Sequence, residues 1–232
     1  MPVVLLVVLS VCGLVVLALW QALRPARRAE FIRSYTLPKG LFEKLRQRHP
    51  QLSLKDCQLV AQALRQFFLA YLAGRRKPVS MPSQVVDDLW HEFILYTRNY
   101  QAFCDQAFGS FMHHTPATVM GGEKRINTGL RRCWWHCCRA ENIHPRKPTR
   151  LPLLFAIDAK LGIAGGFHYV LDCAPLRAAG AQAGGGTHCG GDFSDPSFDG
   201  GLDGLGDAGG NGDSDGGGDG GDGGGCGGGC GS

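Results

Sequence analysis

Residues 83–108, SQVVDDLWHEFILYTRNYQAFCDQAF, determine the fold class of this chain. Apolar residues recur here at steps of three and four, which is the spacing of one face of an α-helix. The members of this apolar stripe are Val85, Leu89, Phe93, Tyr96, Tyr100, Phe103 and Ala107. The spacing predicts an amphipathic helix, or two stacked pieces of one, ended by Gly109.

Further helices are predicted on both sides of this stretch. They span 38–49, 53–74, 123–140 and 153–161, and a last ordered stretch covers 168–173. The second of them begins at a capping box in which Ser53 pairs with Asp56, with Asp in place of the usual Glu. No segment alternates in the way that the strands of a multi-stranded sheet do. The sequence therefore predicts an all-α fold, with a compact helical bundle over 38–176.

The N-terminal residues 1–23 hold an apolar run without a charged residue, VVLLVVLSVCGLVVLALWQAL over 3–23. At ~1.5 Å per residue, a helix of this length crosses the ~30 Å hydrocarbon core of a bilayer. A cleaved signal peptide is the alternative, but it requires a positively charged start, a shorter apolar run and a small-residue cleavage site. Because the chain shows none of these, we expect 1–23 to be a single-pass transmembrane anchor.

The basic residues next to this apolar run lie on its C-terminal side only. Trp20 stands near the end of the run, where interfacial aromatic residues are common, and Arg24, Arg27 and Arg28 follow it. By the positive-inside rule, these arginines place the N-terminus outside and the domain in the cytoplasm, as in a bacterial inner-membrane protein. Residues 24–37 then form a basic juxtamembrane linker.

Residues 177–232 differ in composition from the rest of the chain. After Arg177 there are nine Asp and no Lys or Arg, so this segment carries −9 and, because the whole chain is +4, the remainder carries +13. A Gly- and Asp-rich segment with few apolar residues cannot bury a core, so we expect a disordered acidic tail. The basic remainder favours anionic partners, namely lipid headgroups, nucleic acid or the tail itself, unless its Lys and Arg residues are simply solvated beside a membrane. Lipid headgroups rank above nucleic acid, because the signatures of the common RNA-binding modules are missing.

Ten cysteines are present, and several fall within helical patterns. A thiol in a helix is usually a small buried hydrophobe, so we expect reduced core residues. Cys133, Cys137 and Cys138 surround His136, but a zinc site would need ligands from a second segment. The tail holds further thiols at Cys189, Cys226 and Cys230. Exposed thiols of this kind bind soft metals, form crosslinks or accept modifications, unless they are simply part of a low-complexity end.

A candidate site lies on the polar side of the 83–108 helix. Asp87 and His91 are four residues apart and therefore share one face, where an Asp can orient an imidazole or share a metal. His113 and His114 follow the helix and can fold back beside His91. A cluster of Asp87 or Asp88 with these histidines would suit a divalent transition metal ion or a His acid/base pair. The alternative is structural: His91 hydrogen-bonds within the bundle, and the other two histidines anchor a turn.

Several of these residues together resemble a known family. They are Asp88, Trp90, His91, Tyr100 and Cys104, followed by Phe-Met-His-His-Thr-Pro over 111–116. The pattern resembles the helical region of the glycine-rich domain-containing proteins, and small bacterial membrane proteins with Gly-rich C-termini carry a similar block. The resemblance covers about 40–175. It implies that Trp90, His91, Cys104, His113 and His114 form one spatial unit, and it implies no reaction. The regulatory and RNA-related roles of the plant members are not carried over, because this chain is short and single-domain.

The chain lacks a complete catalytic set, so the sequence favours a membrane-tethered interaction or scaffold module with a flexible acidic arm over an enzyme. Its partners would be the bilayer itself, anionic lipid headgroups or proteins. Two alternatives remain open at this point. One is a metal-binding protein or metal-dependent enzyme built on the His/Asp cluster, and the other is binding of anionic lipid or nucleic acid by the basic body.

Overall fold

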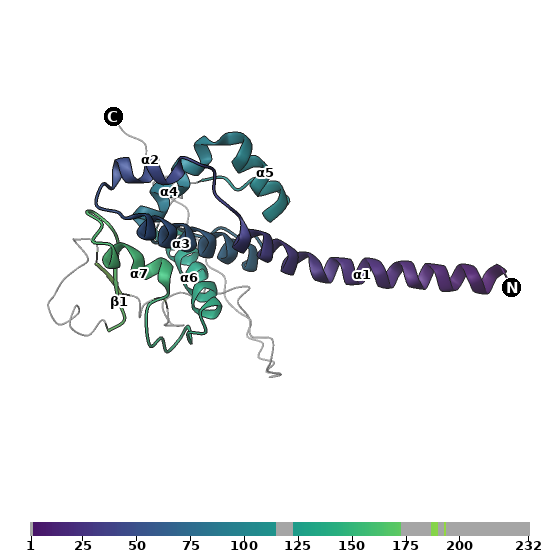
Figure 1. Ribbon diagram of the computed structural model, residues 1–232. Helices are drawn as coiled ribbons and strands as arrows, with labels where there is room; N and C mark the ends of the chain where they lie inside the picture. The colour runs from purple at the N-terminus through teal and green to yellow at the C-terminus, as the bar shows by residue number, and fades with distance from the viewer. Residues whose placement is uncertain (1, 115–122, 173–186, 190–192, 194–232) are drawn as a thin grey trace, which may run out of the picture. The chain divides into compact units, whose positions relative to one another are not determined.

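A computed structural model describes residues 2–114, 123–172, 187–189 and 193 (Figure 1). Within these ranges the chain forms seven helices and one parallel pair of three-residue strands, so the predicted all-α fold is confirmed with a small addition. The helices are α1 (Pro2–Ser34), α2 (Leu41–Arg48), α3 (Leu54–Ala73), α4 (Gln84–Leu95), α5 (Thr97–Ala107), α6 (Glu123–Ala140) and α7 (Leu153–Lys160). The strands are β1 (His168–Val170) and β2 (Thr187–Cys189).

Helix α1 continues beyond the apolar run without a break (Figure 1). Its last turns pack against α3 and α5, where Ile32 is completely buried. The predicted linker over 24–37 is therefore wrong for most of its length, because Phe31 and Ile32 give this basic segment a face that packs on the core. The stretch Leu9–Ser34 is long and apolar enough to cross a membrane, and its large apolar side chains up to Leu23 are exposed.

Helix α3 contacts α1, α2, α4, α6 and α7, and its two ends follow the prediction. The capping box is formed: the Asp56 N–H donates to Ser53 Oγ at 3.2 Å, and the Ser53 N–H donates to Asp56 Oδ2 at 2.9 Å. Gly74 ends the helix. Phe67 and Phe68 of α3 form the centre of an aromatic core. The rings that pack against one or both of them are Trp90, Phe103 and Phe108.

The stretch 83–108 forms two helices, α4 and α5, which meet at Tyr96. The backbone of Tyr96 leaves the helical region with ψ 60°, and its N–H donates to Phe93 O at 3.1 Å. The break turns α5 back toward α4. Trp90 Nε1–H consequently donates to Tyr100 Oη at 3.2 Å, although ten residues of straight helix would span about 15 Å. Of the two forms that the periodicity allows, the broken one is observed.

The C-terminal part of the fold extends past the predicted boundary at residue 176. Strand β2 lies in the segment that was expected to be disordered, and it pairs in parallel with β1, with Tyr169 opposite His188. Phe193 packs its ring 5.9 Å from each of three aromatic rings of the core. Those rings belong to Trp134, Phe155 and Tyr169. The rest of the predicted tail lies outside the residues that the structure describes.

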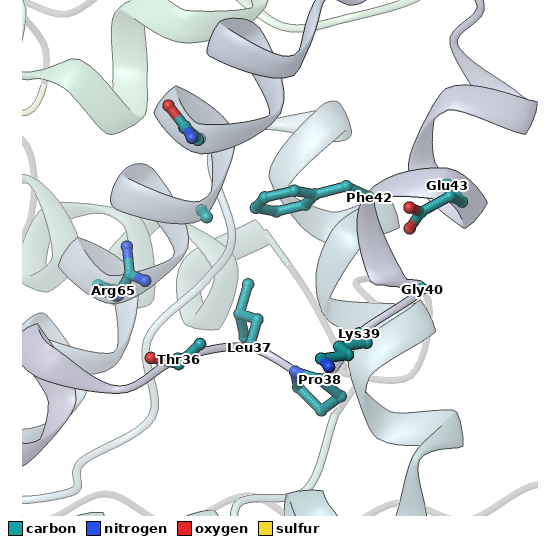
Figure 2. Close-up of a pocket in the computed structure, with 10 residues that line it drawn as sticks. Thr36, Leu37, Pro38, Lys39, Gly40, Phe42, Glu43 and Arg65 are labelled. Atoms are coloured by element: carbon teal, nitrogen blue, oxygen red, sulfur yellow. The ribbon is translucent and has the colours of Figure 1, made fainter.

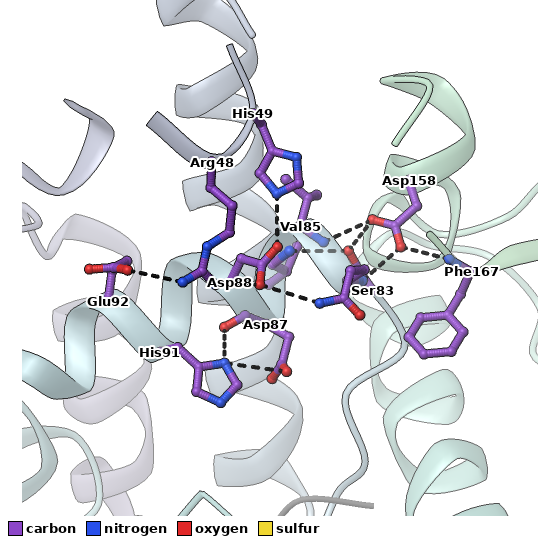
Figure 3. A network of polar contacts seen from close by, with 12 residues as sticks. Arg48, His49, Ser83, Val85, Asp87, Asp88, His91, Glu92, Asp158 and Phe167 are labelled. Atoms are coloured by element: carbon purple, nitrogen blue, oxygen red, sulfur yellow. Dashed lines mark hydrogen bonds and ion pairs between the residues drawn. The ribbon is translucent and has the colours of Figure 1, made fainter. Parts of the chain in front are cut away.

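A buried carboxylate from α7 caps the start of α4 (Figure 3). Asp158 is 1% exposed and accepts four hydrogen bonds, at 2.7 to 3.2 Å. The donors are the Ser83 hydroxyl and the N–H groups of Gln84, Val85 and Phe167. A negative charge at a helix N-terminus also interacts favourably with the helix dipole. Asp158 therefore fixes the position of α4 relative to α7, and with it the candidate site on α4.

Replacement of Asp158 by Ala should destabilise the domain strongly. The substitution removes the acceptor of four hydrogen bonds, two of them fully buried, and we expect the free energy of unfolding to fall by about 3 kcal/mol. Urea unfolding of the full chain in detergent, followed by circular dichroism at 222 nm, measures the change. Asp105→Asn, on the exposed surface of α5, is the control and should change stability by less than about 0.5 kcal/mol. Equal stability of the two variants would contradict the capping role.

Candidate functional site

The first half of α4 brings Asp87 and His91 together, as their spacing predicts (Figure 3). His91 Nδ1 lies 2.9 Å from the backbone oxygen of Asp87 and 3.4 Å from its carboxylate Oδ2. A carbonyl oxygen can only accept, so Nδ1 is the donor in this contact, and Nε2 is the ring nitrogen left to bind a metal ion. The backbone contact thus sets the tautomer of His91, as the partners of metal-binding histidines commonly do.

His114 enters the same cluster from the segment after α5. Its Nε2 lies 3.0 Å from Asp87 Oδ1, and its ring centroid lies 4.2 Å from that of His91. Tyr100 fixes this segment, since its hydroxyl donates to the Met112 carbonyl oxygen at 2.6 Å. The Trp90 ring supports His114 from the core side at 4.6 Å between centroids. The position of His114 therefore depends on the break between α4 and α5.

The three side chains have the geometry of metal ligands. One ligand atom from each of Asp87, His91 and His114 can be chosen so that all lie within 4.8 Å of one another. Ligands bonded to one ion at ~2.0–2.1 Å are separated by about 2.9–3.4 Å, and the 3.0 Å between Asp87 Oδ1 and His114 Nε2 falls in that range. The side chain of His91 is 45% exposed, so the cluster opens to solvent.

His113 lies outside this cluster. Its side chain is exposed, and its ring packs 4.8 Å from the ring of Phe111. The sequence could not show which of the two neighbouring histidines faces His91, because the order of residues along an irregular segment does not determine where each side chain points. The structure thus brings His114 beside His91 and leaves His113 apart from them.

Asp88 belongs to a second polar network on the other side of α4 (Figure 3). Its carboxylate accepts from Arg48 Nη1 and from His49 Nε2, both at 2.8 Å. Arg48 also reaches Glu92 at 3.4 Å. This network joins the end of α2 to α4. Sequence reasoning missed Arg48 and His49, because no spacing signal links residues forty positions apart.

The other residues of the family resemblance serve the core. Trp90, Tyr100 and Cys104 are all buried. Burial raises the pKa of the Tyr100 hydroxyl and that of the Cys104 thiol, so both groups stay neutral. The resemblance implied one spatial unit: Trp90 packs against His114, and Tyr100 bonds to Trp90 and to the Met112 carbonyl oxygen. They position the candidate ligands and do not extend the ligand set.

The cysteines of α6 are core residues, as predicted. Cys133, Cys137 and Cys138 are buried, and the sulfurs of the first two lie 4.0 Å apart. Contact with Cys133 and burial raise the pKa of Cys137, and burial raises that of Cys138 to about 12. Thiols held in this neutral form are poor metal ligands. The tail thiols Cys226 and Cys230 lie outside the described residues, and of Cys189 only the backbone in β2 is described.

A shallow groove lies between the 36–40 segment and helices α2 and α3. It has a volume of about 470 Å³. Figure 2 shows the Leu37 side chain and the Phe42 ring pointing into it, with Glu43 and Arg65 at its borders. Apolar residues such as Leu37 and Phe42 alternate in its lining with polar ones, among them Gln58, Glu43 and Arg65, and its described lining residues include no cluster of metal-ligand side chains.

Together, these features describe a helical domain that carries a two-histidine, one-carboxylate cluster behind an apolar helix. The sequence profile of the UCP032817-like family matches residues 27–193, and the chain belongs to that family. No curated protein and no solved structure is significantly similar to it. The matched range begins inside α1 and ends at Phe193, so it includes the end of α1 and the strand pair, which the predicted domain over 38–176 left out.

His136 provides a pH test of the α6 packing. Its Nε2 is buried without a hydrogen-bond partner among the described residues. Burial, with Arg139 and Arg132 nearby, lowers the pKa of His136 to about 4. The unfolded chain, with a His pKa of about 6.5, takes up this proton first as the pH falls, so folding stability is lost between about pH 6.5 and pH 4.

We therefore expect His136→Gln to reduce the acid sensitivity of the domain. The drop in Tm between about pH 7 and about pH 5 should be smaller in this variant than in the wild type. Thermal unfolding of the full chain in detergent measures it. His168→Gln, at an exposed position, should keep the wild-type drop, and an unchanged drop in His136→Gln would show that His136 is accessible to protons in the folded state.

Proposed function

We propose that this protein is a membrane-anchored domain that binds one divalent transition metal ion through Asp87, His91 and His114. The observation that carries the proposal is the convergence of the three side chains within 4.8 Å, from α4 and from the segment after α5. Two supporting features are the backbone contact that sets the His91 tautomer and the buried Trp90 ring behind His114. Both features limit the orientations of the two imidazole rings before any ion binds.

The ligand types narrow the choice of metal. Two imidazoles and one carboxylate suit Zn²⁺, Fe²⁺ and related ions, and three protein ligands leave coordination positions open. Because His91 is half exposed, water or a small substrate can reach those positions. Such a site is of the catalytic kind rather than the closed structural kind. A bound ion there would act as a Lewis acid or lower the pKa of a bound water.

The membrane part of the proposal rests on α1. The stretch Leu9–Ser34 has the length and composition of a membrane span, and its first large apolar side chains are exposed. Arg24 stacks on Trp20 with 3.4 Å from its guanidinium carbon to the ring centroid, as expected of an interfacial pair. With Arg27 and Arg28 next to it, this end faces the cytoplasm by the positive-inside rule.

The interaction-module hypothesis and the likeness to glycine-rich domain-containing proteins stay predictions. The specific observation that favours the first is the groove lined by Leu37 and Phe42. A protein partner that binds there should lose affinity when Phe42 is replaced by Ala. The metal cluster lies on α4, and a metal-site variant should therefore leave such binding unchanged.

His91→Ala and His114→Ala should each abolish metal binding, whereas His113→Ala should not. Mutation of a residue that only hydrogen-bonds to a metal ligand typically weakens metal affinity roughly 10–100-fold. Loss of one of the three ligands themselves should weaken the affinity for the ion by more than that. Titration of the metal-free full chain in detergent with Zn²⁺ and with Co²⁺, by calorimetry and by the Co²⁺ absorption spectrum, measures it. His113→Ala is a matched control, because it removes the adjacent imidazole from the same segment.

Two results would contradict the metal site. One is the absence of saturable binding of either ion by the wild-type chain. The other is equal affinity of the His91, His113 and His114 variants, which would place any bound ion elsewhere. Circular dichroism of each variant shows that it is folded, so a loss of binding is assigned to the ligand.

A further inference from the structure

We propose that the membrane-facing end of the domain is a binding site for the phosphate headgroups of anionic lipids. The site consists of Arg24, Arg27, Arg28, Arg75 and Arg76, which we call the basic collar. Its placement rests on the membrane anchoring proposed above and is independent of the metal site.

Two arginines of the collar meet at the C-terminal end of α5. Arg76 Nη1 donates to the Phe108 carbonyl oxygen at 3.2 Å. Arg28 covers Gly109, since a Cβ added there would lie 2.5 Å from its Nη2. The guanidinium group of Arg28, from α1, and that of Arg76, from the turn after α3, thus contact adjacent residues of the chain, Gly109 and Phe108. Segments far apart in the sequence are held together here by the packing of α1 on α3 and α5 (Figure 1).

The described residues place no carboxylate against these two arginines. Glu30 of α1 pairs with Arg33, one turn further into the domain. Asp105, in the last turn of α5, accepts from Gln101 Nε2 at 2.9 Å. Neighbouring positive charges without a counter-charge raise the local potential and favour an anion between them.

The collar lies at the depth of lipid headgroups. Arg28 follows Leu23, the last residue of the apolar run, by five positions, or about 7.5 Å along the helix axis. The polar layer on each side of the hydrocarbon core is about 5–7.5 Å thick. Arg28 and the groups beside it are therefore at the level of the phosphates. This placement favours lipid over nucleic acid, because the bilayer supplies phosphates at that level wherever the protein is anchored.

The turn that carries Arg75 and Arg76 has an unusual backbone. Both residues are left-handed, with φ 54° and φ 62°. Position 75 follows the C-cap residue Gly74, and glycine normally fills it because a Cβ there lies too close to the following carbonyl oxygen. Two consecutive arginines in such a turn are strained, and strain of this kind is retained where the side chains have a role.

The test measures lipid affinity of the full chain in detergent micelles by native mass spectrometry, with phosphatidylglycerol and phosphatidylcholine titrated separately. We expect the wild type to prefer phosphatidylglycerol, and the preference to decrease with salt. Arg28→Gln combined with Arg76→Gln should weaken phosphatidylglycerol binding about 30-fold, at about 1 kcal/mol per basic side chain. Arg98→Gln, an exposed charge at the other end of α5, is the matched control and should bind as the wild type does.

Arg75→Gly guards against a folding artefact. Glycine adopts the left-handed turn without strain, so this variant should be at least as stable as the wild type and still bind phosphatidylglycerol about 5-fold more weakly. Unchanged affinity in both collar variants would overturn the proposal. An equal effect of Arg98→Gln would also overturn it, because binding would then follow net charge alone.

Three further measurements separate the sources of phosphate and the two proposals. Inorganic phosphate should not compete at millimolar concentration, and a single-stranded oligonucleotide should not bind through the collar. Binding of the oligonucleotide but not of the lipid would overturn the lipid assignment. Sedimentation with vesicles of neutral lipid tests the anchor: failure to associate overturns both the anchor and the collar.

Zn²⁺ titration of the collar variants should give the same affinity as the wild type. A failure of the metal-site proposal can therefore be told apart from a failure of the collar proposal.

Discussion

The hydrogen bond between Trp90 and Tyr100, continued from the Tyr100 hydroxyl to the Met112 carbonyl oxygen, connects three parts of the chain. It joins α4 to α5 across the break at Tyr96, and it holds the segment that delivers His114. Because all three groups are buried, each needs its partner, and loss of one leaves the others unsatisfied in the core. The segment that carries His114 is consequently tied to the core.

Neighbouring residues at the start of α4 have different roles: some hold the helix in the bundle, and one belongs to the candidate metal site. Ser83 and the first N–H groups are bound by Asp158 of α7, and Asp88 is bound by Arg48 and His49 of α2. Asp87, between these two anchored positions, points to His91 instead (Figure 3) and also contacts His114. Adjacent residues of a helix point about 100° apart, so two consecutive aspartates necessarily serve different surroundings. Here one of them stabilises the bundle and the other is left for a ligand.

Much of the fold follows from patterns within single segments. The helical spacing of α3 to α5, the capping box at Ser53 and the stop at Gly74 are local signals, and they predict these elements well. The Asp87–His91 pair is local as well, since both lie on one continuous helix. What the sequence could not show depends on tertiary contacts. It left open whether the helix breaks at Tyr96, did not distinguish His114 from His113, and did not reveal that Phe193 returns to the core.

The continuity of α1 has a mechanical consequence. A flexible linker between anchor and domain would let the domain turn freely, whereas here a helix runs from the apolar run to the buried Ile32 and transmits orientation, with Pro25 as the one position among its residues where a bend is expected. Membrane spans tilt to match their apolar length to the thickness of the surrounding bilayer. With α1 anchored in a bilayer as proposed, a change of its tilt would be passed on to the bundle. The local thickness of the lipid layer would thereby set the angle at which the opening beside His91 faces the membrane surface.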